Sequence, residues 1–193
     1  MELINYNTQQ QILEPSVITV GSFDGVHLGH QSLFKKMNHY SKMNHCKSVV
    51  ITFNPHPQEV LQNKPDFFLI NSFEQVLLLF EKFDINTTYV IPFSTEFSQK
   101  TAIQFFEVDI FSKINVKAIF MGPNHHFGKQ REGDANTIAQ ICQKRNIELI
   151  TTQEFNINGL AVRSTQIRKH LALKDWKNAE KLMGHTIYLK TVY

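Results

Sequence analysis

Cysteine is scarce in this chain: among its 193 residues there are only two, Cys46 and Cys142. They lie far apart in the sequence and neither belongs to a CxxC or CxxH pattern, which excludes a scaffold held together by disulfides. We expect two reduced thiols in a reducing compartment. Cys142 falls on the apolar face of a predicted helix, so it is expected in the core and not at a reactive site.

Long apolar runs and a strong excess of one charge are also missing. No apolar run approaches the length needed to cross a bilayer, and residues 1–5 lack the basic and apolar regions of a signal peptide. The formal net charge is only +3, with lysines and arginines scattered along the chain, which argues against a nucleic-acid groove. We therefore expect a cytoplasmic protein that binds neither membrane nor nucleic acid, with a small polyanion as a reasonable partner.

Five short apolar runs, rich in Val, Ile or Phe, are present instead. Such runs are typical of strands buried on both faces of a parallel sheet. Apolar residues at helical spacing occupy the intervals 73–83 and 135–142. This alternation predicts one α/β domain with a doubly wound, Rossmann-like sheet of about five parallel strands. The expected strands are residues 17–20, 48–53, 88–91, 117–121 and 147–151.

The chain after the fifth run predicts smaller elements. Residues 155–163 are expected to form a hairpin around Asn158-Gly159. Ser164-Thr165 is expected to cap a helix that runs to about residue 172, and Asp175 to cap another that ends near Gly184. The last residues, from 187 on, read as one more strand, which suggests a fragment or a domain of a usually longer protein.

The most informative segment is residues 21–30, directly after the first expected strand. Gly21 ends the strand, and a His-x-Gly-His motif from His27 to His30 opens a helix. This order brings backbone N–H groups, two imidazoles and a helix N-terminus around one small volume, which suits a phosphate chain. The histidines share one helix face, and Gly29 permits close approach of a ligand. The alternative is a helix start with two exposed histidines.

Phe23 and Asp24 belong to the same segment, and a second loop follows the next expected strand. Asp24 could orient a metal–phosphate complex or brace the loop by accepting backbone N–H bonds, while Phe23 is expected in the core. In the second loop, Asn54-Pro55-His56-Pro57, the prolines hold Asn54 and His56 in set positions; the alternative is a rigid turn without function. Both loops fall beyond the carboxyl ends of strands, where ligands bind in such sheets.

A third loop, residues 122–134, falls at the same edge. Its glycines, aromatic and polar side chains could clasp a flat polar ligand such as a heteroaromatic ring. The adjacent pair His125-His126 is not expected to hold a metal ion, because neighbouring loop side chains rarely converge on one ion. Further along, Arg168 lies one turn after Ser164-Thr165 and could clamp a terminal phosphate bidentately, although this segment alone is an ordinary capped helix.

Together these motifs resemble the H-x-G-H nucleotidyltransferase superfamily, which includes class I aminoacyl-tRNA synthetases. More closely, nearly the whole chain resembles the adenylyltransferase domain of the prokaryotic bifunctional riboflavin kinase/FMN adenylyltransferases, the bacterial FAD synthetase family. The first motif is shared with other nucleotidyltransferases, whereas the Pro-His-Pro and Phe-Gly loops single out the flavin enzymes. The segments that carry the resemblance are 21–31, 52–57, Pro92-Phe93 with Phe97, 122–134 and 164–168.

The resemblance implies transfer of AMP from ATP to FMN, giving FAD and pyrophosphate, with Mg²⁺ held mainly by phosphate oxygens and Asp24 or Asn54 as outer contributors. The catalytic residues that it implies are His27, His30 and Arg168. The implied ATP-binding residues are Gly21, Phe23, Asp24, His27, Gly29, His30, Ser164, Thr165 and Arg168. The implied flavin-binding residues are Asn54, Pro55, His56, Pro57, Asn124, Phe127, Gly128 and Arg131.

Three departures from the family pattern leave alternatives open. Asn124 stands where the family has Asp, and Arg163 stands where a small residue usually precedes the Ser-Thr pair. The adenylyltransferase domain is expected over residues 1–186, and 187–193 would begin a riboflavin kinase domain that is otherwise absent. Kinase activity is therefore not expected from this chain, and a riboflavin kinase domain or protein is a candidate partner. The alternatives are an adenylyltransferase for another phosphate ester and a non-catalytic module that binds nucleotide or flavin.

Overall fold

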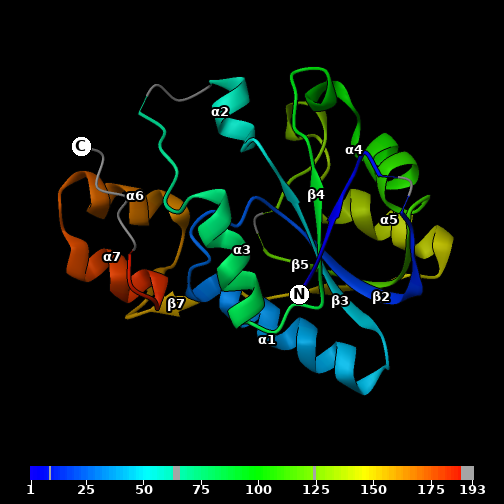
Figure 1. Cartoon of the computed structure of the whole chain (residues 1–193), viewed down its shortest axis with the longest axis horizontal. Helices are drawn as coiled ribbons and strands as arrows, with labels where there is room; N and C mark the ends of the chain where they lie inside the picture. Colours follow the sequence, from blue (N-terminus) through cyan, green and yellow to red (C-terminus); the bar gives the residue numbers. More distant parts are fainter. Residues whose placement is uncertain (9, 63–65, 124, 188–193) are drawn as a thin grey trace.

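The computed structural model describes residues 1–8, 10–62, 66–123 and 125–187. Its centre is a sheet of six strands in the order β1-β4-β3-β2-β5-β6, in which every neighbouring pair is parallel (Figure 1). The five predicted strands are confirmed, and β1 adds a sixth at one edge. The strands are β1 (Glu2–Asn5), β2 (Ile12–Val20), β3 (Lys47–Phe53), β4 (Thr87–Ile91), β5 (Ile114–Met121) and β6 (Glu148–Thr151).

Helices cover both faces of this sheet, as the alternation of strands and helices predicts. Side chains of a strand point to opposite faces in turn, and neighbouring residues such as Val17 and Ile18 are both fully buried, each in a different core. One face packs against α1 (Leu28–Met43) and α3 (Phe73–Lys82). The other face packs against α4 (Ala102–Gln104), the π-helix η2 (Phe105–Ile110) and α5 (Ala135–Arg145). Cys142 of α5 lies in that core, as predicted.

The strand order reverses at β2, which pairs with β3 on one side and with β5 on the other. In an open parallel sheet, ligands bind at such a switch point, outside the carboxyl ends of the strands. The loops that follow β2, β3 and β5 all leave from this edge. They are the three loops that carry the sequence motifs, and short elements shape two of them: α2 (Pro57–Leu61) and η3 (Lys129–Arg131). The 3₁₀ turn η1 (Phe97–Gln99) follows β4.

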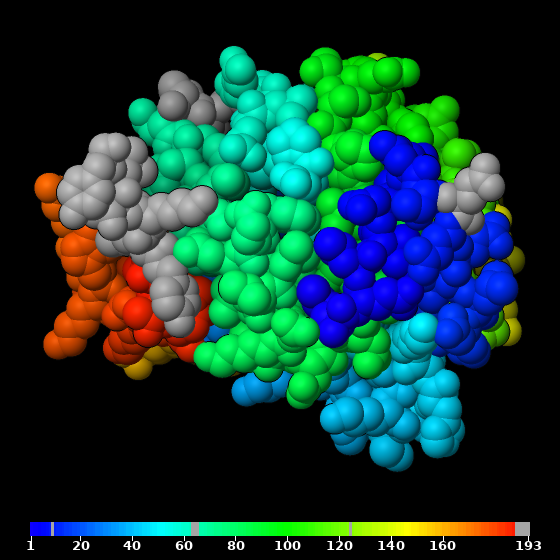
Figure 2. Space-filling view, viewed as in Figure 1, coloured from blue at the N-terminus to red at the C-terminus, as the bar shows by residue number. Residues whose placement is uncertain are grey.

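The C-terminal part forms a small unit beside α3 (Figures 1 and 2). Strands β7 (Asn156–Ile157) and β8 (Leu160–Ala161) form the predicted hairpin. Helices α6 (Ser164–Ala172) and α7 (Trp176–Met183) pack around Ile167, with Ile70 from the segment between α2 and α3 in the same core. Asp175 caps α7 and Gly184 ends it with a φ of +68°, both as predicted.

The expected cap of α6 is wrong. Arg163 occupies the N-cap position and makes no capping hydrogen bond, while Ser164 is the first helical residue. The reason is that the Ser164 hydroxyl is used elsewhere, as a donor to Asp24.

None of the helices in the described part of the chain combines the length and the apolar composition that a membrane span needs. Residues 188–193, which bear most of the expected last strand, lie outside the described residues.

Candidate active site

His27 and His30 form a stacked pair at the start of α1. The Nδ1 atom of His27 accepts a hydrogen bond from the backbone N–H of His30 at 3.3 Å, so His27 caps the helix. The two rings stack with centroids 3.6 Å apart and planes 18° apart. A Cβ at Gly29 would lie 3.1 Å from the His27 ring. Gly29 therefore makes room for this imidazole, a reason that the sequence pattern did not show.

Burial keeps both imidazoles neutral near pH 7. It lowers the pKa of His27 to about 4, and it lowers the pKa of His30 well below the usual value, with smaller contributions from the charges of His27 and His125. The Nδ1 atom of His27 already accepts an N–H, so the neutral ring carries its proton on Nε2. The buried Nδ1 of His30 has no partner among the described residues, and an orphaned acceptor is tolerated better than an orphaned N–H. Each ring therefore offers an uncharged Nε2–H donor.

Asp24 is buried, with 5% of its surface exposed, and it connects the loop after β2 to α6. Its carboxylate accepts a hydrogen bond from the Ser164 hydroxyl at 3.3 Å and forms an ion pair with the guanidinium of Arg168. The Nε atom of Arg168 donates to the backbone oxygen of Phe68 at 2.8 Å. The predicted Arg168 is thus brought to the His27–His30 loop across more than a hundred residues of sequence. Asp24 therefore braces this arrangement through side-chain partners and not through the backbone N–H bonds that the sequence suggested, and its orientation of a metal–phosphate complex stays a prediction.

The loop after β3 lies close to this ion pair. The Nδ1 atom of His56 accepts a hydrogen bond from the backbone N–H of Gln58 at 3.0 Å and caps α2. Burial lowers the pKa of His56, and the nearby charges of Asp24 and Arg168 act on it in opposite directions. Its ring stacks on Phe67 at 4.8 Å. Asn54 and Pro55 of the same loop are exposed at the carboxyl edge of the sheet.

The loop after β5 is held by its glycines and by Phe127. Phe127 is 8% exposed, pairs with Gly133 through two backbone hydrogen bonds of 2.8 and 2.9 Å, and stacks on His125 at 4.6 Å. Gly128 has a φ of +73°, and a Cβ there would lie 2.4 Å from the backbone nitrogen of Ala102. Phe127 and Gly128 therefore give the loop its shape, and their predicted contact with a flavin stays a prediction.

The remaining predicted residues divide into core and surface. Phe23 is buried, as expected, with its ring 4.9 Å from that of His30, and a Cβ at Gly21 would lie 2.8 Å from the same ring. Thr165 and Arg131 are exposed. Asn124 lies outside the described residues, so its predicted contact is not placed.

Sequence reasoning missed the segment between α2 and α3. The guanidinium of Arg168 lies over the ring of Phe67 at 4.4 Å, and Asn71 donates a hydrogen bond to the backbone oxygen of Asp24 at 2.7 Å. Neither Phe67 nor Asn71 belongs to a motif with a recognisable spacing. An aromatic pair, Phe67-Phe68, is the only trace that this segment leaves in the sequence.

The donor set does not fit a metal ion held by the protein alone. No group of three or more His, Cys, Asp and Glu side chains suited to an ion occurs in the described part of the chain. Asp24 has one oxygen bonded to Ser164 and the other paired with Arg168. Mg²⁺ usually keeps several waters and is held through substrate phosphates, so an ion here would enter with the nucleotide. The predicted outer contributions of Asp24 and Asn54 stay predictions.

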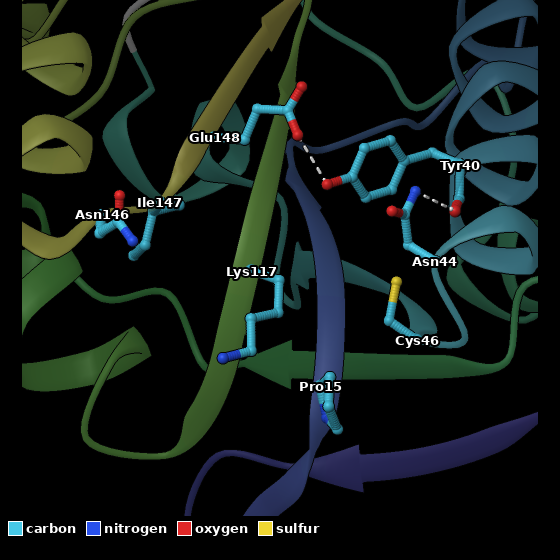
Figure 3. A pocket seen from close by; sticks show the side chains of 8 residues that line it. All are labelled: Pro15, Tyr40, Asn44, Cys46, Lys117, Asn146, Ile147 and Glu148. Carbon is cyan, nitrogen blue, oxygen red and sulfur yellow. Dashed lines mark hydrogen bonds between the residues drawn. The ribbon is translucent and has the colours of Figure 1, made fainter.

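A cavity of about 520 Å³ lies elsewhere, near the amino-terminal ends of the strands (Figure 3). One hydrogen bond of 2.7 Å crosses part of it, from the Tyr40 hydroxyl to Glu148. None of the three motif loops reaches it, so the candidate site is assigned from its side chains and not from a preformed cavity. The lining residues are Pro15, Tyr40, Asn44, Cys46, Lys117, Asn146, Ile147 and Glu148.

Comparison with known proteins finds relatives that align with most of this chain. A bifunctional riboflavin kinase/FMN adenylyltransferase of Buchnera aphidicola (subspecies Schizaphis graminum) is 31% identical over 91% of this chain. A FAD synthetase of Listeria monocytogenes is 27% identical over 90% of the chain and 70% of its own length. The chain spans 56% of the length of the Buchnera relative.

Solved structures share the fold. A structure described as a macrolide-efflux protein from Streptococcus pneumoniae has a TM-score of 0.85 and 27% identity, covering 97% of this chain and 61% of the other. A pantoate-beta-alanine ligase from Francisella tularensis has a TM-score of 0.53 at 15% identity, covering 96% of this chain and 78% of its own, which shows a likeness of fold alone. The sequence model of the FAD synthetase family matches residues 9–166, and these include the His-x-Gly-His and Pro-His-Pro loops. The chain belongs to the FAD synthetase family.

Proposed function

We propose that this chain transfers the adenylyl group of ATP to FMN, forming FAD and releasing pyrophosphate. The Asp24–Arg168 ion pair carries this proposal, because it brings a cation to the loop where two neutral imidazoles begin a helix. A helix N-terminus, two N–H donors and a guanidinium suit a triphosphate. Membership of the FAD synthetase family supports FMN as the acceptor.

In the proposed reaction, an oxygen of the FMN phosphate attacks the α-phosphorus of ATP. A new P–O bond forms, the bond from the α-phosphorus to the bridging oxygen breaks, and pyrophosphate leaves with the electron pair. The protein forms no covalent intermediate, so it contributes positioning and charge stabilisation. ATP enters as its magnesium complex, which is the usual substrate form for such transfers.

Each side chain then has a stated part. The Nε2–H groups of His27 and His30 would donate to phosphoryl oxygens whose negative charge grows in the transition state, which neutral donors can do without changing protonation. Arg168 has donors left on its guanidinium beyond those used by Asp24 and Phe68, and these would bind the β- and γ-phosphates. Ser164 and Thr165 would contact ATP at the same β- and γ-phosphates.

The flavin half of the site is proposed on the loops after β3 and β5. Residues 54–57 would border the isoalloxazine ring, and 124–131 would hold the ring and its phosphate, with Arg131 as an exposed cation. The Buchnera relative is named for riboflavin kinase as well as adenylyl transfer. A riboflavin kinase domain or protein that supplies FMN is therefore a proposed partner.

The proposal is tested by incubating the purified chain with ATP, Mg²⁺ and FMN and identifying the flavin product by mass. FAD is the expected product, and correctly folded protein that yields none would overturn the proposal. Pyrophosphate release is also measured with a panel of other phosphate esters in place of FMN. Faster release with one of these than with FMN would indicate an adenylyltransferase for another acceptor. Tight binding of ATP or FMN without any product would instead indicate a regulatory module.

A further inference from the structure

One aromatic ring connects the two halves of the proposed site. The ring of Phe67 stacks on His56, with centroids 4.8 Å apart and planes 28° apart. The guanidinium carbon of Arg168 lies 4.4 Å from the centroid of the same ring. His56 belongs to the loop proposed for the flavin, and Arg168 to the helix proposed for the ATP phosphates. Phe67 lies in neither loop, yet its ring contacts a residue of each half.

Phe67 completes the set of contacts that fixes the Arg168 guanidinium. Asp24 pairs with one terminal nitrogen, and the backbone oxygen of Phe68 accepts from Nε at 2.8 Å. These two bonds lie in the plane of the guanidinium and restrict rotation within it, whereas a flat ring against its face restricts tilting. The remaining N–H donors of Arg168 are then aimed in one direction.

His56 restrains the ring from the other loop. Its Nδ1 accepts the backbone N–H of Gln58, and its backbone N–H donates to Glu59 at 3.0 Å, so the imidazole is held by the start of α2. A ring stacked on a fixed imidazole has fewer orientations than one facing solvent. A shift of the loop that bears His56 would therefore displace Phe67, and through it Arg168.

We propose that Phe67 is a positioning residue that orients Arg168 toward the ATP phosphates and couples it to the His56 loop. This inference rests on the proposed adenylyl transfer for its meaning. The contacts of Phe67 with Arg168 are present before any acceptor binds. Phe67 is therefore expected to affect the affinity for MgATP even when FMN is absent. Phe67 itself touches no reacting atom in this account.

The test compares dissociation constants for MgATP, measured by calorimetry without FMN. Phe67→Leu removes the ring and is expected to weaken MgATP binding about fivefold, in the range of a partly desolvated cation–π contact. Phe67→Tyr keeps the ring and is expected to bind MgATP like the wild type. Trp176→Leu is the matched control, since it removes a half-exposed aromatic ring from α7 that enters no ring contact among the described residues.

The coupling is tested by a double-mutant cycle with His56→Asn. Asparagine can still cap α2, so this substitution removes the stacked imidazole and leaves a helix cap. His56→Asn is expected to weaken MgATP binding about twofold in the wild type and to have no effect in Phe67→Leu, because the ring that transmits it is gone. Thermal unfolding of each variant shows whether it is folded at the assay temperature.

Three results would overturn the inference: MgATP binding unchanged in Phe67→Leu, a loss of the same size in Trp176→Leu, or additive effects of the His56 and Phe67 substitutions. If Phe67→Leu does not fold, failure of Phe67→Tyr to match the wild type decides against it. FAD formation by the wild-type chain tests the proposed function separately from the role of Phe67. A chain that makes no FAD but loses MgATP affinity in Phe67→Leu would contradict adenylyl transfer to FMN and support the role of Phe67.

Discussion

At the scale of single residues, the site depends on histidines that are kept from becoming cations. His27 caps a helix with the nitrogen that a proton would otherwise occupy, and His30 is stacked beneath it. Neutral donors aimed at the phosphoryl oxygens gain strength as charge develops there.

Replacement of His30 by alanine should lower kcat by about 10²–10³, the usual loss for one transition-state donor. His39→Ala is the matched control, because His39 lies on the same helix and is exposed. Steady-state FAD formation measures both variants. If the kcat of His30→Ala lay within a few fold of the kcat of His39→Ala, His30 would not be a catalytic residue.

The buried histidines also predict how stability depends on pH. The pKa of His27 is about 4 in the folded chain and near its ordinary value in the unfolded chain. The unfolded chain therefore takes up a proton first, so stability is complete above about pH 6.5 and falls as the pH drops toward about 4. From about pH 7 to about pH 5 the free energy of unfolding should fall by roughly 2 kcal/mol through His27 alone.

Urea unfolding at the two pH values measures this loss. His27→Asn is the comparison, because asparagine keeps a helix cap but does not titrate. The variant should lose less stability than the wild type over the same interval. Equal losses in the two proteins would mean that His27 is not the titrating group.

At the scale of elements, the loop after β5 depends on a glycine in a conformation that other residues avoid. Gly128 combines a φ of +73° with a ψ of −179°, a region that is essentially restricted to glycine. It also lies against the backbone at the start of α4. Packing of α4 therefore fixes where the 125–131 segment of the loop can run.

Gly128→Ala should destabilise the fold by about 2 kcal/mol or more, because strain and a backbone clash add. It should raise the KM for FMN more than the KM for ATP, since the displaced loop belongs to the proposed flavin half. Gly159→Ala is the control, with a φ of +79° and nothing within 4 Å of the added Cβ. A larger change in the KM for ATP would argue against the assignment of this loop.

The elements also show what could be predicted from sequence. β3 and β5 could be predicted because each contains a short run of apolar residues buried on both faces, 49–51 in β3 and 118–121 in β5. β1 could not, since only Ile4 of its four residues is buried. The His-x-Gly-His motif could be found because it is local. The contacts of Phe67 could not, because they join three segments that only the folded chain brings together.

At the scale of the whole molecule, the C-terminal helices are attached to the sheet through the site itself. The Asp24–Arg168 pair joins α6 to the loop after β2, and the Gln31 side chain donates to the backbone oxygen of Met183 at 2.6 Å. The ring of His185 lies 3.0 Å from the backbone oxygen of Gly25. We therefore expect that ligand binding at the loop after β2 and the packing of α6 and α7 against this loop depend on each other.

Asp24→Asn should lower the free energy of unfolding by about 3 kcal/mol, because it leaves the Arg168 charge largely buried without its partner. Glu107→Gln is the control, since it breaks a half-exposed pair with Arg145 that should contribute about 1 kcal/mol or less. Chemical denaturation measures both. A loss for Asp24→Asn no larger than for the control would show that the pair does not hold the C-terminal helices in place.

The most direct test of the central claim follows the phosphorus atoms of ATP during turnover. The chain is supplied with FMN, Mg²⁺ and ATP labelled at the α-phosphorus, and in a parallel reaction with ATP labelled at the γ-phosphorus. Adenylyl transfer predicts that the α-label appears in FAD and the γ-label in pyrophosphate, with one pyrophosphate for each FAD formed. An α-label that never enters the flavin product, with folded protein and both substrates present, would contradict the account.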